Sequence, residues 1–204
     1  MVENEFKVML KRGQYETLLA LYEWDKVIQQ TNYYYDTAEL TLSDRHVTCR
    51  VRKIGGECFL QIKLPNGKDY SRIELEKKLG AEIPEELSAE LLNALAGDRA
   101  ELPLPDVRLL GALSTSRSVK RFEGAEIDLD KSEYFGKTDY ELEIEFTDEA
   151  AARAVLAQCT KTAGLAKSGD VCTGKIRRFL EEYGKNGGNE LLGNIGLLHT
   201  TPMG

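Results

Sequence analysis

Val2-Glu3-Asn4-Glu5-Phe6-Lys7-Val8 is the stretch on which the interpretation of this 204-residue chain rests. Side chains of a β-strand point alternately to its two faces, so a strand here places Glu3, Glu5 and Lys7 on one face. Two carboxylates at neighbouring positions of one face repel each other in a plain solvated sheet. They suit a divalent cation, which binds hard oxygen ligands, and the lysine suits the anion that the cation carries. The stretch therefore predicts a metal and anion site, provided that other strands carry matching charged faces.

Seven further segments have the composition or the alternation of strands. We expect these strands over 27–37, 46–53, 57–64, 70–79, 113–122, 125–134 and 138–146. Gly55-Gly56 and Pro65-Asn66-Gly67 stand between consecutive segments and are typical of hairpin turns. Because strands joined by hairpins pair antiparallel, the sequence predicts an antiparallel sheet of about eight strands.

Helices are expected in four places. Apolar residues at helical spacing predict a helix over 15–24. Pro84 suits the first position of a second helix, for which Leu87, Leu91, Leu92 and Leu95 supply the apolar stripe. Asp148 and Gly164 suit the two ends of a helix over 149–163, and a last helix is expected over 174–183. These apolar stripes need the apolar face of the sheet as a partner.

Composition restricts the class of protein. The net charge of −7 argues against a general nucleic-acid binder, and no apolar run approaches the ~18 residues of a membrane span. The acidic N-terminal residues lead directly into a strand, which argues against a signal peptide. The four cysteines have no CxxC spacing and are typical of reduced structural thiols. We therefore expect a cytoplasmic protein with no nucleic-acid or membrane partner.

Charges of one sign are grouped on the polar strand faces. Arg50 and Arg52 share one face, and Glu141, Glu143 and Glu145 share another. A sheet with one solvated face accounts for any single strand, but such a sheet would be expected to interleave the signs. Carboxylates suit Mg²⁺ or Mn²⁺, whereas arginine and lysine suit phosphate oxygens. The faces therefore predict a metal-bound polyphosphate as the ligand.

An ordered series of motifs resembles the CYTH superfamily, also called the triphosphate tunnel metalloenzymes. The series comprises Glu3–Lys7 (ExExK), Tyr34–Thr37, Arg50–Arg52, Leu60–Lys63, Glu74–Glu76, Thr115–Arg117, Asp128–Asp130 and Glu141–Glu145. The resemblance implies an α+β fold with a closed eight-stranded antiparallel β-barrel, a tunnel with a charged interior and helices packed outside. It covers nearly the whole chain, so we expect one tunnel domain over 1–183 and a C-terminal tail over 184–204. Some members dimerise, and apolar residues in the tail are consistent with a homodimer.

The resemblance also implies roles for individual residues. The implied metal ligands, for Mg²⁺ or Mn²⁺, are Glu3, Glu5, Glu74, Glu76, Asp128, Glu141 and Glu143. The implied substrate-binding residues are Lys7, Arg50, Arg52, Lys63, Arg117, Arg121 and Lys175. Glu141, Glu143 and Lys63 are the implied catalytic residues.

The function expected from these residues is metal-dependent hydrolysis of a small triphosphate. Inorganic triphosphate is the expected substrate because the sequence has no obvious patch for recognising a base. A class IV-type adenylate cyclase, which converts ATP to cyclic AMP and pyrophosphate, and a thiamine triphosphatase remain as alternatives. A polyphosphate-binding module without catalysis is a further alternative of a different class.

Overall fold

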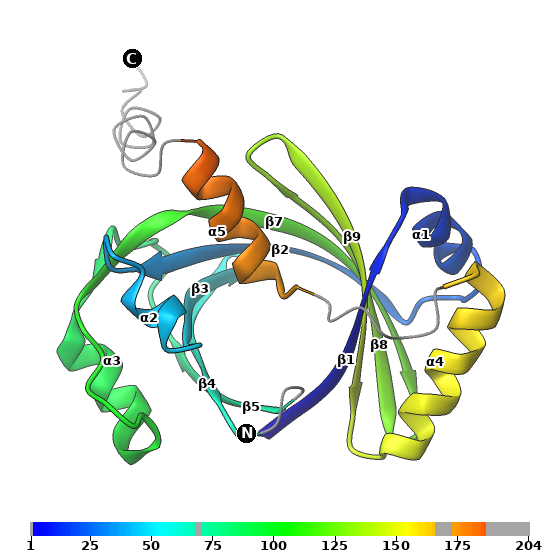
Figure 1. The fold of residues 1–204 in the computed structure, drawn as a ribbon, viewed down its shortest axis with the longest axis horizontal. Helices are drawn as coiled ribbons and strands as arrows, with labels where there is room; N and C mark the ends of the chain where they lie inside the picture. The colour runs from blue at the N-terminus through cyan, green and yellow to red at the C-terminus, as the bar shows by residue number, and fades with distance from the viewer. Residues whose placement is uncertain (1, 68–70, 166–172, 187–204) are drawn as a thin grey trace.

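Eight strands form a closed antiparallel barrel in the computed structural model, which describes residues 2–67, 71–165 and 173–186. Figure 1 shows the ring. Its strands are β1 (Val2–Leu10), β2 (Lys26–Asp36), β3 (Thr48–Ile54), β4 (Glu57–Pro65), β5 (Ser71–Lys78), β7 (Val107–Phe122), β8 (Ala125–Tyr134) and β9 (Lys137–Phe146). They follow the order β2-β3-β4-β5-β1-β9-β8-β7, and pairing of β2 with β7 closes the ring. The expected fold class is thus confirmed, with a two-residue strand β6 (Glu86–Leu87) added beside β7.

Strand register brings distant charged residues side by side. Lys7 of β1 lies opposite Glu143 of β9, and Glu5 lies opposite Glu145. Apolar residues alternate with these positions and are buried on the outer side of the barrel wall, under the helices. Because the ring is closed, the polar positions of the strands face a common interior.

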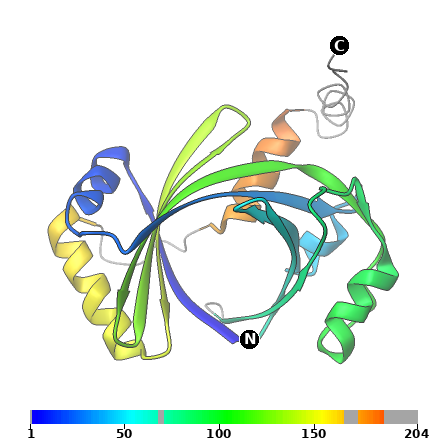
Figure 2. The same ribbon diagram turned by 180° about the vertical axis from the view of Figure 1, so that it is seen from behind.

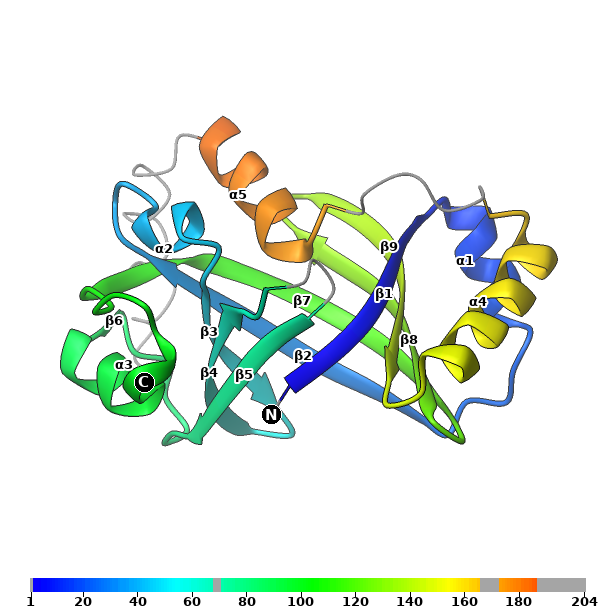
Figure 3. The ribbon, with the colours of Figure 1, turned by 60° about the horizontal axis from the view of Figure 1, so that its bottom comes forward.

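Five α-helices of the described residues lie around the barrel. They are α1 (Arg12–Leu19), α2 (Thr41–Asp44), α3 (Ala89–Ala96), α4 (Glu149–Ala163) and α5 (Lys175–Lys185). Figure 2 shows α1 and α4 side by side on one flank and α3 on the opposite flank. Figure 3 shows α5 and α2 on the same side of the barrel. None of the helices in the described ranges is long and apolar enough to cross a membrane.

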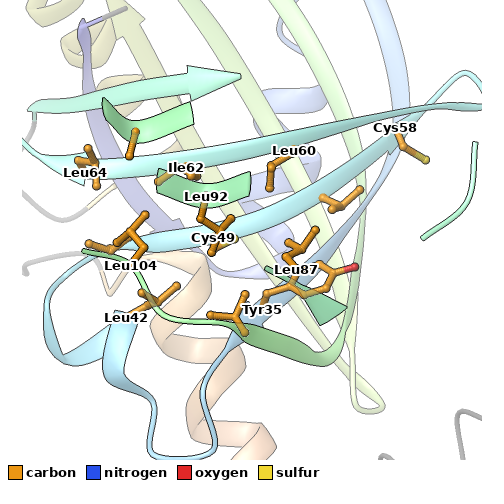
Figure 4. Packing of buried hydrophobic residues seen from close by; sticks show 14 residues of the cluster. Tyr35, Leu42, Cys49, Cys58, Leu60, Ile62, Leu64, Leu87, Leu92 and Leu104 are labelled. Carbon is orange, nitrogen blue, oxygen red and sulfur yellow. The ribbon is translucent and has the colours of Figure 1, made fainter. Parts of the chain in front are cut away.

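Two large apolar clusters fill the space between wall and helices. One, shown in Figure 4, packs α3 against β3 and β4 through residues such as Leu60, Ile62 and Leu92, each with no exposed surface. The other packs α1 and α4 against β8 and β9 around Ile127 and Ile144. Three cysteines belong to these clusters, and all three are unpaired thiols. The helices therefore lie outside the barrel, as expected.

Helix α4 agrees with its sequence signals. The Oδ1 atom of Asp148 accepts a hydrogen bond from the Ala150 N–H at 2.8 Å, which caps the first turn. The helix ends at Gly164, whose φ of 60° lies in the left-handed region that favours glycine. Both predicted ends of this helix are confirmed.

Two other helices differ from their predicted boundaries. The first helix spans Arg12–Leu19 instead of 15–24, and the Trp24 indole N–H donates to the Leu19 carbonyl at 2.8 Å. The helix expected from Pro84 begins only after Ser88, whose hydroxyl caps it by accepting from the Leu91 N–H. Pairing with β7 takes residues 86–87 into a strand instead, so tertiary contact overrides the local helix signal at these residues.

Strand β7 starts at Val107, six residues before the predicted start, and contains Gly111. The register against β2 shifts between Tyr34 and Tyr35 at this point. Gly111 has a φ of 155°, and a Cβ atom there would lie 3.1 Å from the Phe179 ring of α5. The glycine therefore allows α5 to approach the barrel wall closely. The tail over 187–204 lies outside the described residues, so the predicted division at residue 183 stays a prediction.

Substitution Leu92→Ala should lower the free energy of unfolding by about 2–5 kcal/mol, because it leaves a cavity between α3 and the barrel. Leu102→Ala, in the same insertion, is a matched control. Leu102 is 57% exposed, so its loss should cost less than about 0.5 kcal/mol. Urea unfolding of the two variants measures the difference. Equal costs would contradict the packing role of α3.

Candidate active site

A cavity of about 810 Å³ occupies the barrel interior and opens beside α2 and α5. Its basic lining residues are Lys7, Arg50, Arg52, Lys63, Arg72, Arg117, Lys175 and Arg177. Its acidic lining residues are Glu5, Asp44, Glu143 and Glu145. The lining thus holds twice as many lysines and arginines as acidic side chains, which favours an anionic ligand.

Arg50 and Arg52 project from β3 and are each held by a neutral side chain. The Arg50 Nε–H donates to Gln61 Oε1 at 2.8 Å, and the Arg52 Nε–H donates to Asn32 Oδ1 at 3.2 Å. Burial, together with the charges of Arg50 and Arg117, lowers the pKa of Arg52 to about 10. Glu74 opposes this shift but does not cancel it, so the charge of Arg52 is compensated only in part and this section of the wall is suited to bind an anion.

Glu143 accepts hydrogen bonds from three cations carried by three different elements. Its carboxylate oxygens lie 2.8 Å from Lys7 Nζ of β1, 2.5 Å from Arg117 Nη2 of β7 and 2.6 Å from Lys175 Nζ of α5. Burial opposes the charged form, but Lys175, Lys7 and Arg117 hold the pKa of Glu143 well below its usual range. The carboxylate is therefore ionised and links β9 to all three elements.

The Arg117 guanidinium is surrounded by carboxylates. It forms a two-point contact with Asp130, with Nε–Oδ1 at 2.8 Å and Nη2–Oδ2 at 2.7 Å, and it also contacts Asp128 and Glu143. Three acids thus compensate the charge of Arg117, whereas Arg50 and Arg52 contact amide side chains.

Helix α5 contributes Arg178 as well as Lys175 to the acidic side of the lumen. Arg178 lies 3.0 Å from Glu141 and 2.9 Å from Asp139, and Lys175 lies 2.7 Å from Glu141. Burial opposes ionisation of Glu141, but Lys175 and the other nearby cations lower its pKa. Arg178 was missed in the sequence because it lies outside every strand motif. Its helical spacing from Lys175 was the signal that could have found it.

An acidic cluster lies on β8 and β9. Single carboxylate oxygens of Glu126, Asp128 and Glu145 lie within 4.8 Å of one another. Asp128 is 2% exposed, and its Oδ1 atom has no hydrogen-bond partner among the described residues. Burial and the neighbouring acids raise the pKa of Asp128 to about 7, although Arg117 opposes the shift. Of these three residues, only Asp128 was predicted to be a metal ligand. The inward alternation of β8 and β9 is the signal that could have identified Glu126 and Glu145 as well.

A second cavity of about 700 Å³ lies at the other end of the acidic cluster. Glu145 lines both cavities, and Glu74, Glu76 and Arg121 line only the second. Arg121 is an exposed side chain 2.6 Å from Glu126, so it does not reach the first cavity with the other expected phosphate ligands. The Lys63 ammonium lies 3.0 Å from Glu74, which connects the two groups of residues.

The expected site residues are therefore distributed over three regions. Lys7, Arg50, Arg52, Lys63, Arg117, Lys175, Glu5 and Glu143 line the first cavity. Glu74, Glu76 and Arg121 line the second. Glu141 and Asp128 are buried in the wall next to the first. The backbone of Glu3 pairs with Arg72, and its side chain lies outside the described residues.

Comparison with known proteins gives consistent matches. A family model described as CYTH domain matches residues 1–171. A Bacillus subtilis protein described as "Putative triphosphatase YjbK" is 29% identical over 195 residues, which cover 91% of this chain and 97% of that protein.

Solved structures match over most of their length. A crystal structure from Bacillus halodurans, described as "a putative adenylate cyclase", has a TM-score of 0.70 at 25% identity, covering 87% of this chain and 96% of that chain. A Hippeastrum protein described as a "putative adenylyl cyclase" with "a dominant triphophatase activity" has a TM-score of 0.65 at 19% identity. The match covers 89% of this chain and 95% of that chain. At 19% identity this second likeness supports the fold alone.

Substitution Glu143→Gln should lower the free energy of unfolding by about 3–5 kcal/mol, because it removes the anion shared by the buried Arg117 and Lys175 and the half-buried Lys7. Glu181→Gln is the control. Glu181 lies on the exposed side of α5, 3.9 Å from Arg177, and its loss should cost less than about 1 kcal/mol. Denaturant unfolding compares the two, and a cost at Glu143 no larger than that at Glu181 would contradict the linking role.

Proposed function

The chain belongs to the CYTH domain family, and from this we propose that it is a divalent-metal-dependent hydrolase of inorganic triphosphate acting inside the barrel. The observation that carries the proposal is the convergence of eight basic side chains on one cavity of about 810 Å³ beside an acidic cluster. The description of the Bacillus subtilis relative as a triphosphatase supports the same reaction.

The basic residues provide binding and orientation of the phosphates. Arg50 and Arg52 have their planar forks directed by neutral partners, and such forks suit phosphate oxygens. Lys7 and Lys175 add point charges around Glu143. Fixed cations of this kind stabilise the charge that develops on the equatorial and leaving oxygens during phosphoryl transfer.

The acidic cluster has the donor set of a magnesium or manganese site. Glu126, Asp128 and Glu145 offer hard oxygens within 4.8 Å of one another, and the unpartnered Asp128 Oδ1 is the kind of atom that a cation would satisfy. Glu5 lies opposite Glu145 in the register and is a further candidate ligand. When bound, the ion would polarise a phosphoryl oxygen and acidify a water molecule.

The residues around Glu143 have a different role in this proposal. Glu141 and Glu143, expected as metal ligands, each contact at least two cations of the protein itself. We propose that Glu143 holds Lys7 and Lys175 in place against the substrate. Glu74 and Glu76 line the second cavity and are candidate ligands at that mouth.

Adenylate cyclase activity is the second candidate. The Bacillus halodurans structure is described as a putative adenylate cyclase, and a cavity of about 810 Å³ has room for a nucleoside as well as a triphosphate. The two reactions give different products, so one experiment separates them.

Incubation with inorganic triphosphate and Mg²⁺ or Mn²⁺ should release orthophosphate and pyrophosphate, and chelation of the metal should abolish the release until metal is restored. Ion-exchange chromatography of the products provides the measurement. Cyclic AMP and pyrophosphate from ATP, with no orthophosphate from triphosphate, would instead identify a cyclase. Tight binding without turnover for every metal and pH would identify a polyphosphate-binding module.

Substitution Asp128→Asn should weaken Mn²⁺ binding at least about 10-fold, because it removes a charged oxygen from the cluster. Arg52→Ala should leave Mn²⁺ binding largely intact and weaken triphosphate binding, since Arg52 lies on the basic part of the wall. Electron paramagnetic resonance of Mn²⁺ and calorimetry with triphosphate measure the two affinities. Identical effects of the two substitutions on both ligands would contradict the separation of roles.

A further inference from the structure

Two amide side chains hold the two arginines of β3. Gln61 Oε1 accepts from the Arg50 Nε–H at 2.8 Å, and Asn32 Oδ1 accepts from the Arg52 Nε–H at 3.2 Å. We propose that Gln61 and Asn32 are positioning residues that orient Arg50 and Arg52 for a phosphate chain without forming an ion pair with either of them. This inference rests on the proposed function for the identity of the anion.

Strand register brings the amides to these positions. Asn32 lies directly opposite Arg52, and Arg50 lies directly opposite Gln61. Gln61 is in turn opposite Glu76 of β5. Directly opposite residues of antiparallel strands have neighbouring side chains, so each amide is placed beside its arginine by the ladder itself.

The orientation of the Gln61 amide is also determined. Its Nε2 donates to Glu76 Oε2 at 2.7 Å, so its Oε1 must face Arg50. Gln61 is 3% exposed and Asn32 is 1% exposed, which leaves neither side chain room to turn towards water. A buried amide of fixed direction can thus hold a guanidinium at one nitrogen and leave its two terminal nitrogens for two-point contact with phosphate.

The neutrality of the amides is as important as their position. Within the described residues, Arg50 and Arg52 form no ion pair with a carboxylate, whereas Arg117 contacts three. A carboxylate would orient an arginine equally well, but it would compensate the charge that an anionic ligand needs. The lowered pKa of Arg52 agrees with a half-buried cation whose charge Glu74 compensates only in part.

Asn32→Asp keeps the side-chain volume and the acceptor but adds a negative charge beside Arg52. It should weaken triphosphate binding by about 10-fold or more, the scale of one charge-assisted interaction, and should raise KM more than it lowers kcat.

The corresponding test at Arg50 combines Gln61→Glu with Glu76→Gln. In this double variant the amide introduced at position 76 can donate to the carboxylate introduced at position 61, so the charge is exchanged between the two positions and the total charge is kept. Comparison with Glu76→Gln alone isolates the effect of a negative charge beside Arg50, and the double variant should bind triphosphate more weakly.

Gln29→Glu is the matched control. Gln29 lies on the same strand as Asn32 but is exposed on the outer face, 2.9 Å from the Ser116 hydroxyl. The control adds the same charge to β2 outside the lumen and should leave triphosphate affinity unchanged. An equal loss of triphosphate affinity in Gln29→Glu and Asn32→Asp would overturn the proposal. So would an unchanged triphosphate affinity in both Asn32→Asp and the double variant at positions 61 and 76.

A second measurement does not depend on triphosphate. In the protein with ¹⁵N-labelled arginine, the Nε–H signals of Arg50 and Arg52 should exchange slowly with water, and Lys substitutions assign them. Gln61→Met should remove the protection of Arg50 only, and Asn32→Leu that of Arg52 only. Protection that is absent in the wild type, or unaffected by these variants, overturns the positioning role. Protection that behaves as expected in a protein that neither binds nor hydrolyses triphosphate supports the positioning role and rejects the proposed function.

Discussion

The shared contact of Glu143 with Lys7, Arg117 and Lys175 is the interaction on which the interior of this protein depends. A buried carboxylate is stable only when cations and hydrogen bonds compensate it. Here the compensation comes from two barrel strands and from α5, which the sequence places far from β9. The same contact therefore holds the barrel wall together and attaches the last helix to it.

Compensation of charge divides the lumen into two regions. Around Glu143, acids and bases pair with one another, and Arg117 is fully engaged by Asp128, Asp130 and Glu143. On β3, by contrast, Arg50 and Arg52 are paired with amides. Burying positive charge there costs free energy, and binding of an anion would offset that cost. The charge-paired region is suited to hold its geometry, and the region of Arg50 and Arg52 is suited to bind a ligand.

The two cavities also differ in the charges that line them. In the first, which opens beside α2 and α5, most of the charged lining residues are bases, whereas the second has four glutamates and Arg121. Glu145 lines both cavities and is itself part of the acidic cluster with Asp128. Phosphate oxygens and divalent cations are attracted by opposite charges. The junction between the two cavities is thus the region where both kinds of ligand would meet.

Local periodicity was sufficient to predict much of this structure. Alternation along the strands identified the charged faces, and the end signals of Asp148 and Gly164 identified α4 correctly. The ordered motifs also predicted the closed barrel. These features depend on neighbouring residues of one segment, or on a resemblance that spans nearly the whole chain.

Tertiary structure alone decided which charges are compensated. Arg117 and Arg52 are similar in sequence, as arginines on the polar face of a strand, but one contacts three acids and the other an amide. The same applies to Glu143, which contacts three cations, and to Asp128, which retains an unpartnered oxygen among the described residues. These differences arise from the register between strands and from the docking of α5. The sequence by itself determined the strands and their charged faces, because side-chain alternation is local; the partner of each charge was decided only when the ring closed, because pairing joins residues that are distant along the chain.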